Sequence, residues 1–284
     1  MSNIFKPTRQ WYTDLCEYYG VTPEKALELG SRSEGRKPDL PGSKTCQPVS
    51  GMTFEDIWAL EKRDSVESVY KFYKDQGAWS SFRQCVRHKD MEKLHMSFFQ
   101  TLSSANVFTD GYHICEYGAG VAPFTMSLLK YVDDKTAKKL DFKITIADLD
   151  CEHFDFAKYR LNSIKEKREM KNLELVFKTI TPAGPPEFDS TIDAVICFEV
   201  LEHVPSPVDV LMNFKNNMKY GSYYFENFIK HDHDEKQDHS PDLDSARNER
   251  EAYYKTLNDH YDLVYPDKET SDKNPNVTRI WIKN

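Results

Sequence analysis

The sequence predicts an α/β protein with a doubly wound sheet of seven strands, the last of them antiparallel, behind an N-terminal helical extension. Three observations support this prediction. Strand-like and helix-like segments alternate from Gly111 onward, a glycine turn joins the first strand to the first helix, and only a loop separates the last two strands.

The alternation starts with an apolar segment over residues 112–117 and continues to the end of the chain. We expect further strands at 142–147, 173–180, 192–198, 222–229, 261–265 and 277–282, and helices at 123–132, 151–167, 206–218 and 245–260. Strands separated by helices form parallel pairs with right-handed crossovers. The last two strands should instead pair antiparallel at an edge, because no helix is expected between them.

The first hundred or so residues are predicted to be helical. Thr22 is a good N-cap before Pro23, and Gly30 suits the end of that helix. Ser65 is expected to open another helix that Gly77 ends. We therefore divide the chain into a helical extension and substrate lid at 1–108 and a ligand-binding core at 109–284.

Composition limits the classes of partner. The net charge of −8 argues against a nucleic-acid-binding protein, since phosphate backbones require a positive field. No apolar run approaches membrane-spanning length, and residues 1–10 do not resemble a signal peptide. The cysteines form no C-x-x-C pair, and the two at 115 and 197 lie in apolar runs typical of buried thiols. We expect a cytoplasmic protein that binds a small molecule.

A glycine turn follows the first predicted strand. Gly118 permits backbone angles that other residues avoid, and Gly120 lets the main chain approach a ligand closely. A strand that turns sharply into a helix through glycines is typical of sites for nucleotide-like ligands.

Carboxylates end two other predicted strands. Asp148 follows the second strand, where an acid can accept both hydroxyls of a ribose; the alternative is a helix N-cap, for which Asp150 competes. Phe198 and Glu199 emerge from an apolar run that is typical of a strand buried on both faces.

These segments, ICEYGAG at 114–120, IADLD at 146–150 and IDAVICFEVLEHV at 192–204, together resemble the class I S-adenosylmethionine-dependent methyltransferases, which have a Rossmann-like fold. The resemblance covers about residues 111–284. It implies S-adenosyl-L-methionine as cofactor. The residues implied around the cofactor are Glu116, Tyr117, Gly118, Ala119 and Gly120 at its methionine part, Asp148 at the ribose, Leu149 at the adenine, and Phe198 and Glu199 beside it.

Two departures from the family pattern stand out. Ala122 replaces the third glycine of the fuller motif. The segment 178–182 lacks the acid that often lies near the adenine, so we expect that contact from backbone or from Thr181.

Candidate catalytic groups follow the fourth and fifth predicted strands. They are Glu199 and His203 after the fourth strand, and His231 and His233 after the fifth. A neutral imidazole there could take a proton from an acceptor. The alternatives are a solvated charged loop for 230–239 and a local structural role for His203. No dedicated metal site is expected, because the His-x-His spacing matches no strong ligand pattern.

The leading hypothesis is transfer of a methyl group to oxygen or nitrogen of a small-molecule acceptor. The basic residues of the loop at 31–51 would suit an anionic acceptor, and a solvated loop is the alternative. Two other hypotheses are a non-catalytic relative that serves as a binding partner and a nicotinamide-dependent oxidoreductase. The latter should have glycine where Pro123 stands.

Overall fold

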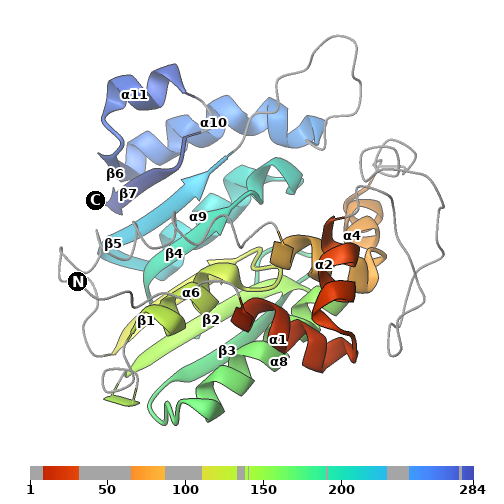
Figure 1. Ribbon diagram of the computed structural model, residues 1–284. Coiled ribbons are helices and arrows are strands. Elements are labelled where there is room, and N and C mark those ends of the chain that lie inside the picture. Colours follow the sequence, from red (N-terminus) through yellow and green to blue (C-terminus); the bar gives the residue numbers. More distant parts are fainter. Residues whose placement is uncertain are drawn as a thin grey trace.

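The computed structural model describes residues 9–31, 65–86, 111–132, 138–139, 141–189, 191–228, 243–274 and 277–284. Its centre is a seven-stranded sheet with the strand order β3-β2-β1-β4-β5-β7-β6 (Figure 1). The strands are β1 (Tyr112–Tyr117), β2 (Phe142–Leu149), β3 (Glu174–Ile180), β4 (Ile192–Phe198), β5 (Met218–Asn227), β6 (Tyr261–Tyr265) and β7 (Arg279–Lys283). The predicted fold class is confirmed.

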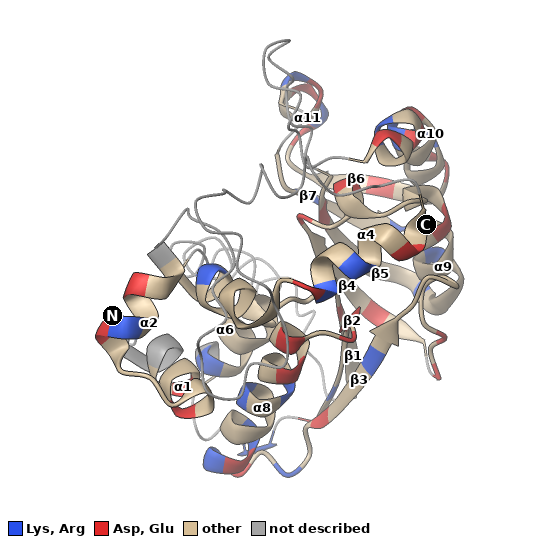
Figure 2. Cartoon of the chain, turned by 90° about the vertical axis from the view of Figure 1, so that its right-hand side faces the viewer, with Lys and Arg blue, Asp and Glu red and all other residues tan. Residues whose placement is uncertain are grey.

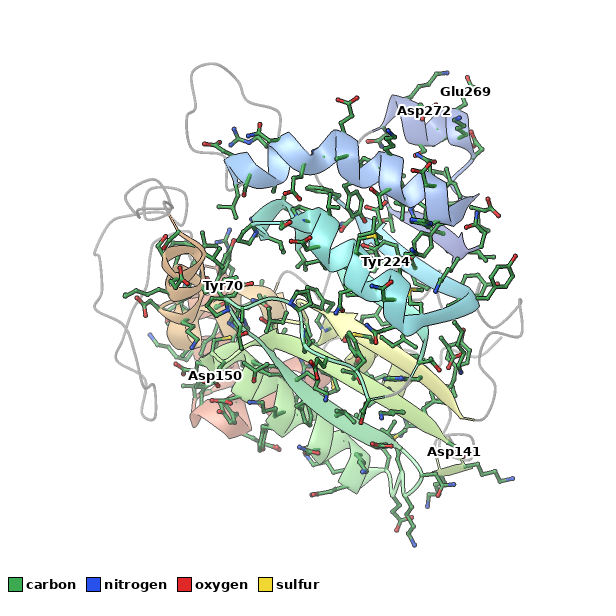
Figure 3. All side chains as sticks on the ribbon, turned by 180° about the vertical axis from the view of Figure 1, so that it is seen from behind. Tyr70, Asp141, Asp150, Tyr224, Glu269 and Asp272 are labelled. Atoms are coloured by element: carbon green, nitrogen blue, oxygen red, sulfur yellow. The ribbon has the colours of Figure 1, made fainter. Side chains whose placement is uncertain are left out.

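Helices cover both faces of this sheet. They are α1 (Arg9–Tyr19), α2 (Pro23–Ser31), α4 (Val66–Lys74), α6 (Pro123–Tyr131), α8 (Glu152–Lys167), α9 (Pro207–Asn217), α10 (Asp244–His260), α11 (Lys268–Lys273) and the short 3₁₀ helix η1 (Leu201–His203). From β1 the chain adds β2 and then β3 toward one side of the sheet, and β4 and then β5 toward the other side. Right-handed crossovers in opposite directions put α6 and α8 on one face and α9 and α10 on the other (Figures 1 and 3).

The register of the parallel strands brings the motif residues to one edge. Tyr117 at the end of β1 pairs with Ala147 of β2, and Glu116 pairs with Ile196 of β4. The residues that follow each strand therefore meet at the edge where the parallel strands end, which we call the carboxyl edge. This is where ligands bind in open α/β sheets.

The last strand, β7, runs antiparallel to both of its neighbours, as predicted. The pair of β7 and β6 forms one edge of the sheet, also as predicted. One detail of the prediction was wrong, because the short helix α11 stands where a loop was expected. Buried Arg279 explains this arrangement, since its guanidinium donates to the Ser271 hydroxyl and to the Asn274 carbonyl and so holds α11 against β7.

The N-terminal helices share a core with α8. Leu15 and Tyr19 of α1, together with Ala26 of α2, pack against Phe156 of α8. Residues 77–86 are helical and contribute Ala78, Phe82 and Cys85 to the same cluster. Helix α4 instead packs Val69 and Phe72 into the main core beside the sheet. The expected boundary between residues 108 and 109 lies outside the described residues.

Charges of both signs are interspersed over the helices. Figure 2 shows lysines, arginines, aspartates and glutamates side by side on α8 and α11. Where the structure describes the chain, no helix combines the length and apolar character that a membrane crossing requires.

The predicted N-caps are confirmed, and one of the two glycine predictions is wrong. The Thr22 hydroxyl accepts from the Lys25 N–H, and Ser65 caps α4 through the Ser68 N–H. Gly77, with φ +57°, follows the turn that ends α4 and separates it from the next helix, whereas Gly30 lies inside α2.

Gly30 marks a close approach between two helices instead of a helix end. A Cβ atom there would lie 2.3 Å from Val86 Cγ2 and 2.6 Å from the Phe82 carbonyl oxygen. Because the carbonyl oxygen belongs to backbone, relief would require α2 to move away from the helix at 77–86.

We predict that Gly30→Ala lowers the free energy of unfolding by about 1–3 kcal/mol, because overpacking outweighs the gain in helix propensity. Urea titration followed by circular dichroism measures this change. Leu27→Ala is the control, since Leu27 is half-exposed on the same helix and its loss should cost under about 0.5 kcal/mol. Equal stability of the two variants would contradict the close approach.

Candidate functional site

The site begins with a buried carboxylate beneath the first turn of α6. Glu116 of β1 is 4% exposed, and its carboxylate accepts from the Phe124 N–H at 3.1 Å, the Thr125 N–H at 2.9 Å and the Thr125 hydroxyl. The two N–H groups belong to the first turn of the helix, where backbone donors have no partners within the helix. Glu116 thus joins the end of β1 to the start of α6 across the glycine turn.

Burial raises the pKa of Glu116 to about 7, although its hydrogen bonds with Thr125 and Phe124 act in the opposite direction. The nearby charge of Arg160 also lowers the pKa of Glu116. Arg160 of α8 is fully buried and donates to the Val121 carbonyl at 3.1 Å. The turn is therefore held from the α8 side as well.

The glycine turn is closely packed by protein groups. The Gly118 and Ala119 N–H groups both donate to the Ala147 carbonyl of β2. Gly118 has φ +66°, and a Cβ atom on it would lie 2.3 Å from a methyl group of Val200, just beyond β4. A glycine at this position is required by the turn and by the neighbouring strand end together.

Gln84, from the N-terminal helices, lies against the other glycine. A Cβ atom on Gly120 would lie 2.1 Å from Gln84 Oε1, and the same oxygen accepts from the Val121 N–H at 3.0 Å. Gln84 Nε2 donates to the Ser80 hydroxyl. Sequence reasoning missed Gln84, because no motif links the helix at 77–86 to the turn.

Asp148 lies directly beside this turn. One of its oxygens accepts from the Gly120 N–H and the other from the Leu149 N–H at 2.6 Å. The alternative role of Asp148 or Asp150 as N-cap of α8 is wrong, because Cys151 occupies that position. Asp150 is exposed. Figure 3 shows Asp150 at the same end of the sheet as Tyr70 of α4.

The end of β4 has a strained backbone. Glu199 has φ +54°, in the left-handed region that non-glycine residues rarely adopt. Its N–H donates to Asn227 Oδ1 at 2.6 Å, which joins the ends of β4 and β5. Phe198 is half-buried, with its ring 6.4 Å from that of Phe124.

Glu226, next to Asn227, has a structural role. Its carboxylate is fully buried and accepts from Trp281 Nε1 at 3.1 Å and from the Phe228 N–H at 2.7 Å. Arg279 Nη1 lies 3.8 Å from the same carboxylate. These contacts tie the end of β5 to β7.

His203 lies in η1, directly after β4. Its Nε2 is 3.9 Å from Glu202 Oε1, and its ring centroid is 5.7 Å from that of Tyr73 on α4. The N-terminal extension therefore reaches the carboxyl edge at this histidine. The other two candidate histidines, His231 and His233, lie outside the described residues.

The remaining predicted residues differ in exposure. Tyr117 is buried, with its ring 5.0 Å from that of Phe214, so its side chain belongs to the core rather than to the edge. Ala119 and Leu149 are buried at the edge itself. Thr181 is exposed beyond β3.

A group of three potential metal ligands at this edge was not predicted from the sequence. Asp148, Cys151 and His153 are all buried, and one potential ligand atom of each lies within 4.8 Å of the others. The spacing D-x-x-C-x-H over 148–153 was a usable signal.

We predict that Glu116 makes folding pH-dependent. Its pKa of about 7 in the folded protein exceeds the ordinary value, so the folded state binds the extra proton between about pH 4.5 and 7. This contribution to stability is complete below that range and is lost as the pH rises through it. The difference in unfolding free energy between the wild type and Glu116→Gln should therefore favour the wild type more at pH 5 than at pH 8. Urea titrations at both pH values test this, and equal differences would contradict it.

Comparisons with known proteins gave matches among solved structures only. No protein-family model matches the chain, and no curated protein matches its sequence. Among solved structures, magnesium protoporphyrin IX methyltransferase from Synechocystis PCC 6803 with bound SAM is similar at 13% identity and a TM-score of 0.49, over 78% of this chain and 99% of that one. An amino pentose methyltransferase from Micromonospora echinaspora is similar at 10% identity and 0.38, over 51% and 55%.

A cyclase, SpnF, is similar at 12% identity and a TM-score of 0.39, over 61% of this chain and 57% of that one. Identities this low bear on the fold alone. With its strand order, its reversed β7 and its glycine turn between β1 and α6, the chain has the fold of the class I S-adenosylmethionine-dependent methyltransferases.

Proposed function

We propose that the protein transfers a methyl group from S-adenosyl-L-methionine to oxygen or nitrogen of a small-molecule acceptor. In this proposal the cofactor binds at the carboxyl edge, over the ends of β1, β2 and β4. The N-terminal helices cover the acceptor site at this edge.

The position of Asp148 is the observation that carries the proposal. Each of its oxygens accepts one backbone N–H, and a carboxylate oxygen has two acceptor sites. Acceptor capacity therefore remains for two ribose hydroxyls. Its bond to the Gly120 N–H ties this acceptor to the glycine turn, so that the ribose and methionine ends of the cofactor would be held in one fixed geometry.

The other implied residues fit the same ligand. Leu149 offers an apolar side chain at the adenine end, and Gly118, which has no side chain of its own, lies at the methionine end. Phe198 and Glu199 stand at the next strand end, where the left-handed backbone of Glu199 directs main-chain groups differently from those of a regular strand.

The bound cofactor would supply a methyl group on a positively charged sulfur, which needs in-line approach of the acceptor more than acid–base help. Residues of this chain would orient the acceptor, exclude water and receive a proton. His203 is the best-placed described candidate, because it lies beside Tyr73 of the N-terminal helices. Glu199, His231 and His233 remain candidates for the same role.

Two alternatives make direct tests necessary. A binding protein without activity would share the fold and bind the cofactor without turnover. A nicotinamide-dependent oxidoreductase would bind its cofactor at the same edge, although Pro123 begins α6 where that fingerprint needs glycine. A shared fold, in addition, does not fix the reaction.

We predict that Asp148→Asn weakens binding of S-adenosylhomocysteine about tenfold or more, because hydrogen bonds to a charged group contribute about 1.5–3 kcal/mol each. Isothermal titration calorimetry measures the affinity. The matched control is Asp150→Asn, an exposed neighbour that should bind like the wild type. Binding of NADH instead of S-adenosylhomocysteine by the wild type would overturn the proposal.

We predict that the wild type transfers labelled methyl from S-adenosylmethionine into the fraction of a cell extract below about 1 kDa. His203→Asn should lower kcat at least about tenfold, in the range typical of a lost proton acceptor, with little change in cofactor affinity. His260→Asn, at the far end of α10, is the control. Binding without transfer would favour the non-catalytic alternative.

A further inference from the structure

We propose that Asp148, Cys151 and His153 form a binding site for a soft divalent cation, with Zn²⁺ as the best match, and that this cation competes with the cofactor for Asp148. The competition rests on the function proposed above. The cation site itself rests only on the geometry of these three side chains.

The three side chains converge because of the local chain path. Asp148 belongs to the end of β2, Cys151 is the N-cap of α8, and His153 lies in the first turn of that helix. A two-residue connection therefore brings a carboxylate, a thiol and an imidazole to one point. The thiol Sγ is 3.0 Å from His153 Nε2, which is 3.8 Å from Asp148 Oδ1.

These separations suit a four-coordinate ion. Tetrahedral Zn²⁺ with bonds of about 2.0–2.3 Å places its ligand atoms about 3.3–3.6 Å apart. The observed atoms lie within 4.8 Å of one another, so small side-chain rotations complete the geometry. Three protein ligands leave a fourth position for water, as in open zinc sites.

The donor set selects the class of cation. Thiolate and imidazole are ligands of Zn²⁺ and related ions, whereas Mg²⁺ and Ca²⁺ take oxygen ligands. In the present state the Cys151 thiol donates to the Leu149 carbonyl at 3.1 Å. Binding of the cation would displace this proton to solvent and replace the S–H bond with an S–metal bond.

His153 is free to adjust its ring toward a cation. Its side chain is 5% exposed, and within the described part of the chain its Nδ1 atom has no hydrogen-bond partner. The ring can therefore turn Nε2 toward a cation without breaking a hydrogen bond at Nδ1.

The cation and the cofactor would both bind Asp148, so each would exclude the other. The same carboxylate accepts from the Gly120 N–H and is the proposed acceptor for the ribose hydroxyls. A cation bound to Asp148 would withdraw those acceptor sites from the ribose. The cation would therefore act as a competitive inhibitor of cofactor binding.

Cobalt binding tests the site without the cofactor. Titration of the full chain with Co²⁺ should give one ion per chain with a thiolate-to-cobalt absorption band, displaced by Zn²⁺ but not by Mg²⁺. The band should vanish in Cys151→Ser and weaken in His153→Gln. It should persist in Cys16→Ser, which removes a half-exposed thiol on α1. No band in the wild type, or an unchanged band in Cys151→Ser, would overturn the proposal.

Two further measurements use the wild type alone. Zn²⁺ should slow alkylation of Cys151 by iodoacetamide, as followed by mass spectrometry, and equal rates with and without Zn²⁺ would overturn the site. Saturating Zn²⁺ should raise the apparent Kd for S-adenosylhomocysteine about tenfold or more, by reciprocal linkage. An unchanged Kd would overturn the competition. A chain that binds Co²⁺ but no S-adenosylhomocysteine would retain the cation site and refute the proposed function.

Discussion

The buried carboxylate of Glu116 is the contact on which the carboxyl edge depends. Glu116 sits at the end of β1 and accepts from two N–H groups at the start of α6, so the turn between them has little freedom. An unpaired donor at this depth would cost about 1–3 kcal/mol, and one carboxylate satisfies two of them. Asp148 restrains the same turn from β2, and Arg160 restrains it from α8.

This arrangement makes the N-terminal helices part of the turn's environment rather than an added layer. Val121 belongs to the same apolar cluster as Leu15 and Phe82, and its N–H donates to Gln84. A movement of the helix at 77–86 would therefore change the packing around Gly120. If the N-terminal helices act as a lid, opening that lid would be coupled to the geometry of the proposed cofactor site through Gln84.

Sequence patterns predicted the strands and the edge because those features depend on local spacing. The apolar runs at β1, β4 and β6 have the predicted bounds, and Asp148 lies beside Gly120 because parallel strands end together. Gly30 was misinterpreted for the opposite reason: a glycine at a helix contact and a glycine at a helix end have the same local sequence. Gln84 was unpredictable in the same way, since its role exists only once the helix at 77–86 packs against the glycine turn. Glu116 was predicted to lie at the end of the first strand, but its hydrogen bonds with the start of α6 were not predicted.

Glu199 shows how strain and function are connected at this edge. A left-handed backbone costs a non-glycine residue about 1 kcal/mol or more, and glycine would relieve that cost. The chain nevertheless has glutamate there and supports it with Asn227 at the end of β5. Glu199 and Asn227 lie at strand ends on the carboxyl edge. The strain is therefore located where a ligand would bind. A glutamate at such a strained position is best explained by a use for its carboxylate. Glu199 is therefore a stronger candidate than Glu226 for contact with the cofactor or the acceptor. In Glu226, Trp281 and the Phe228 N–H already occupy the carboxylate oxygens.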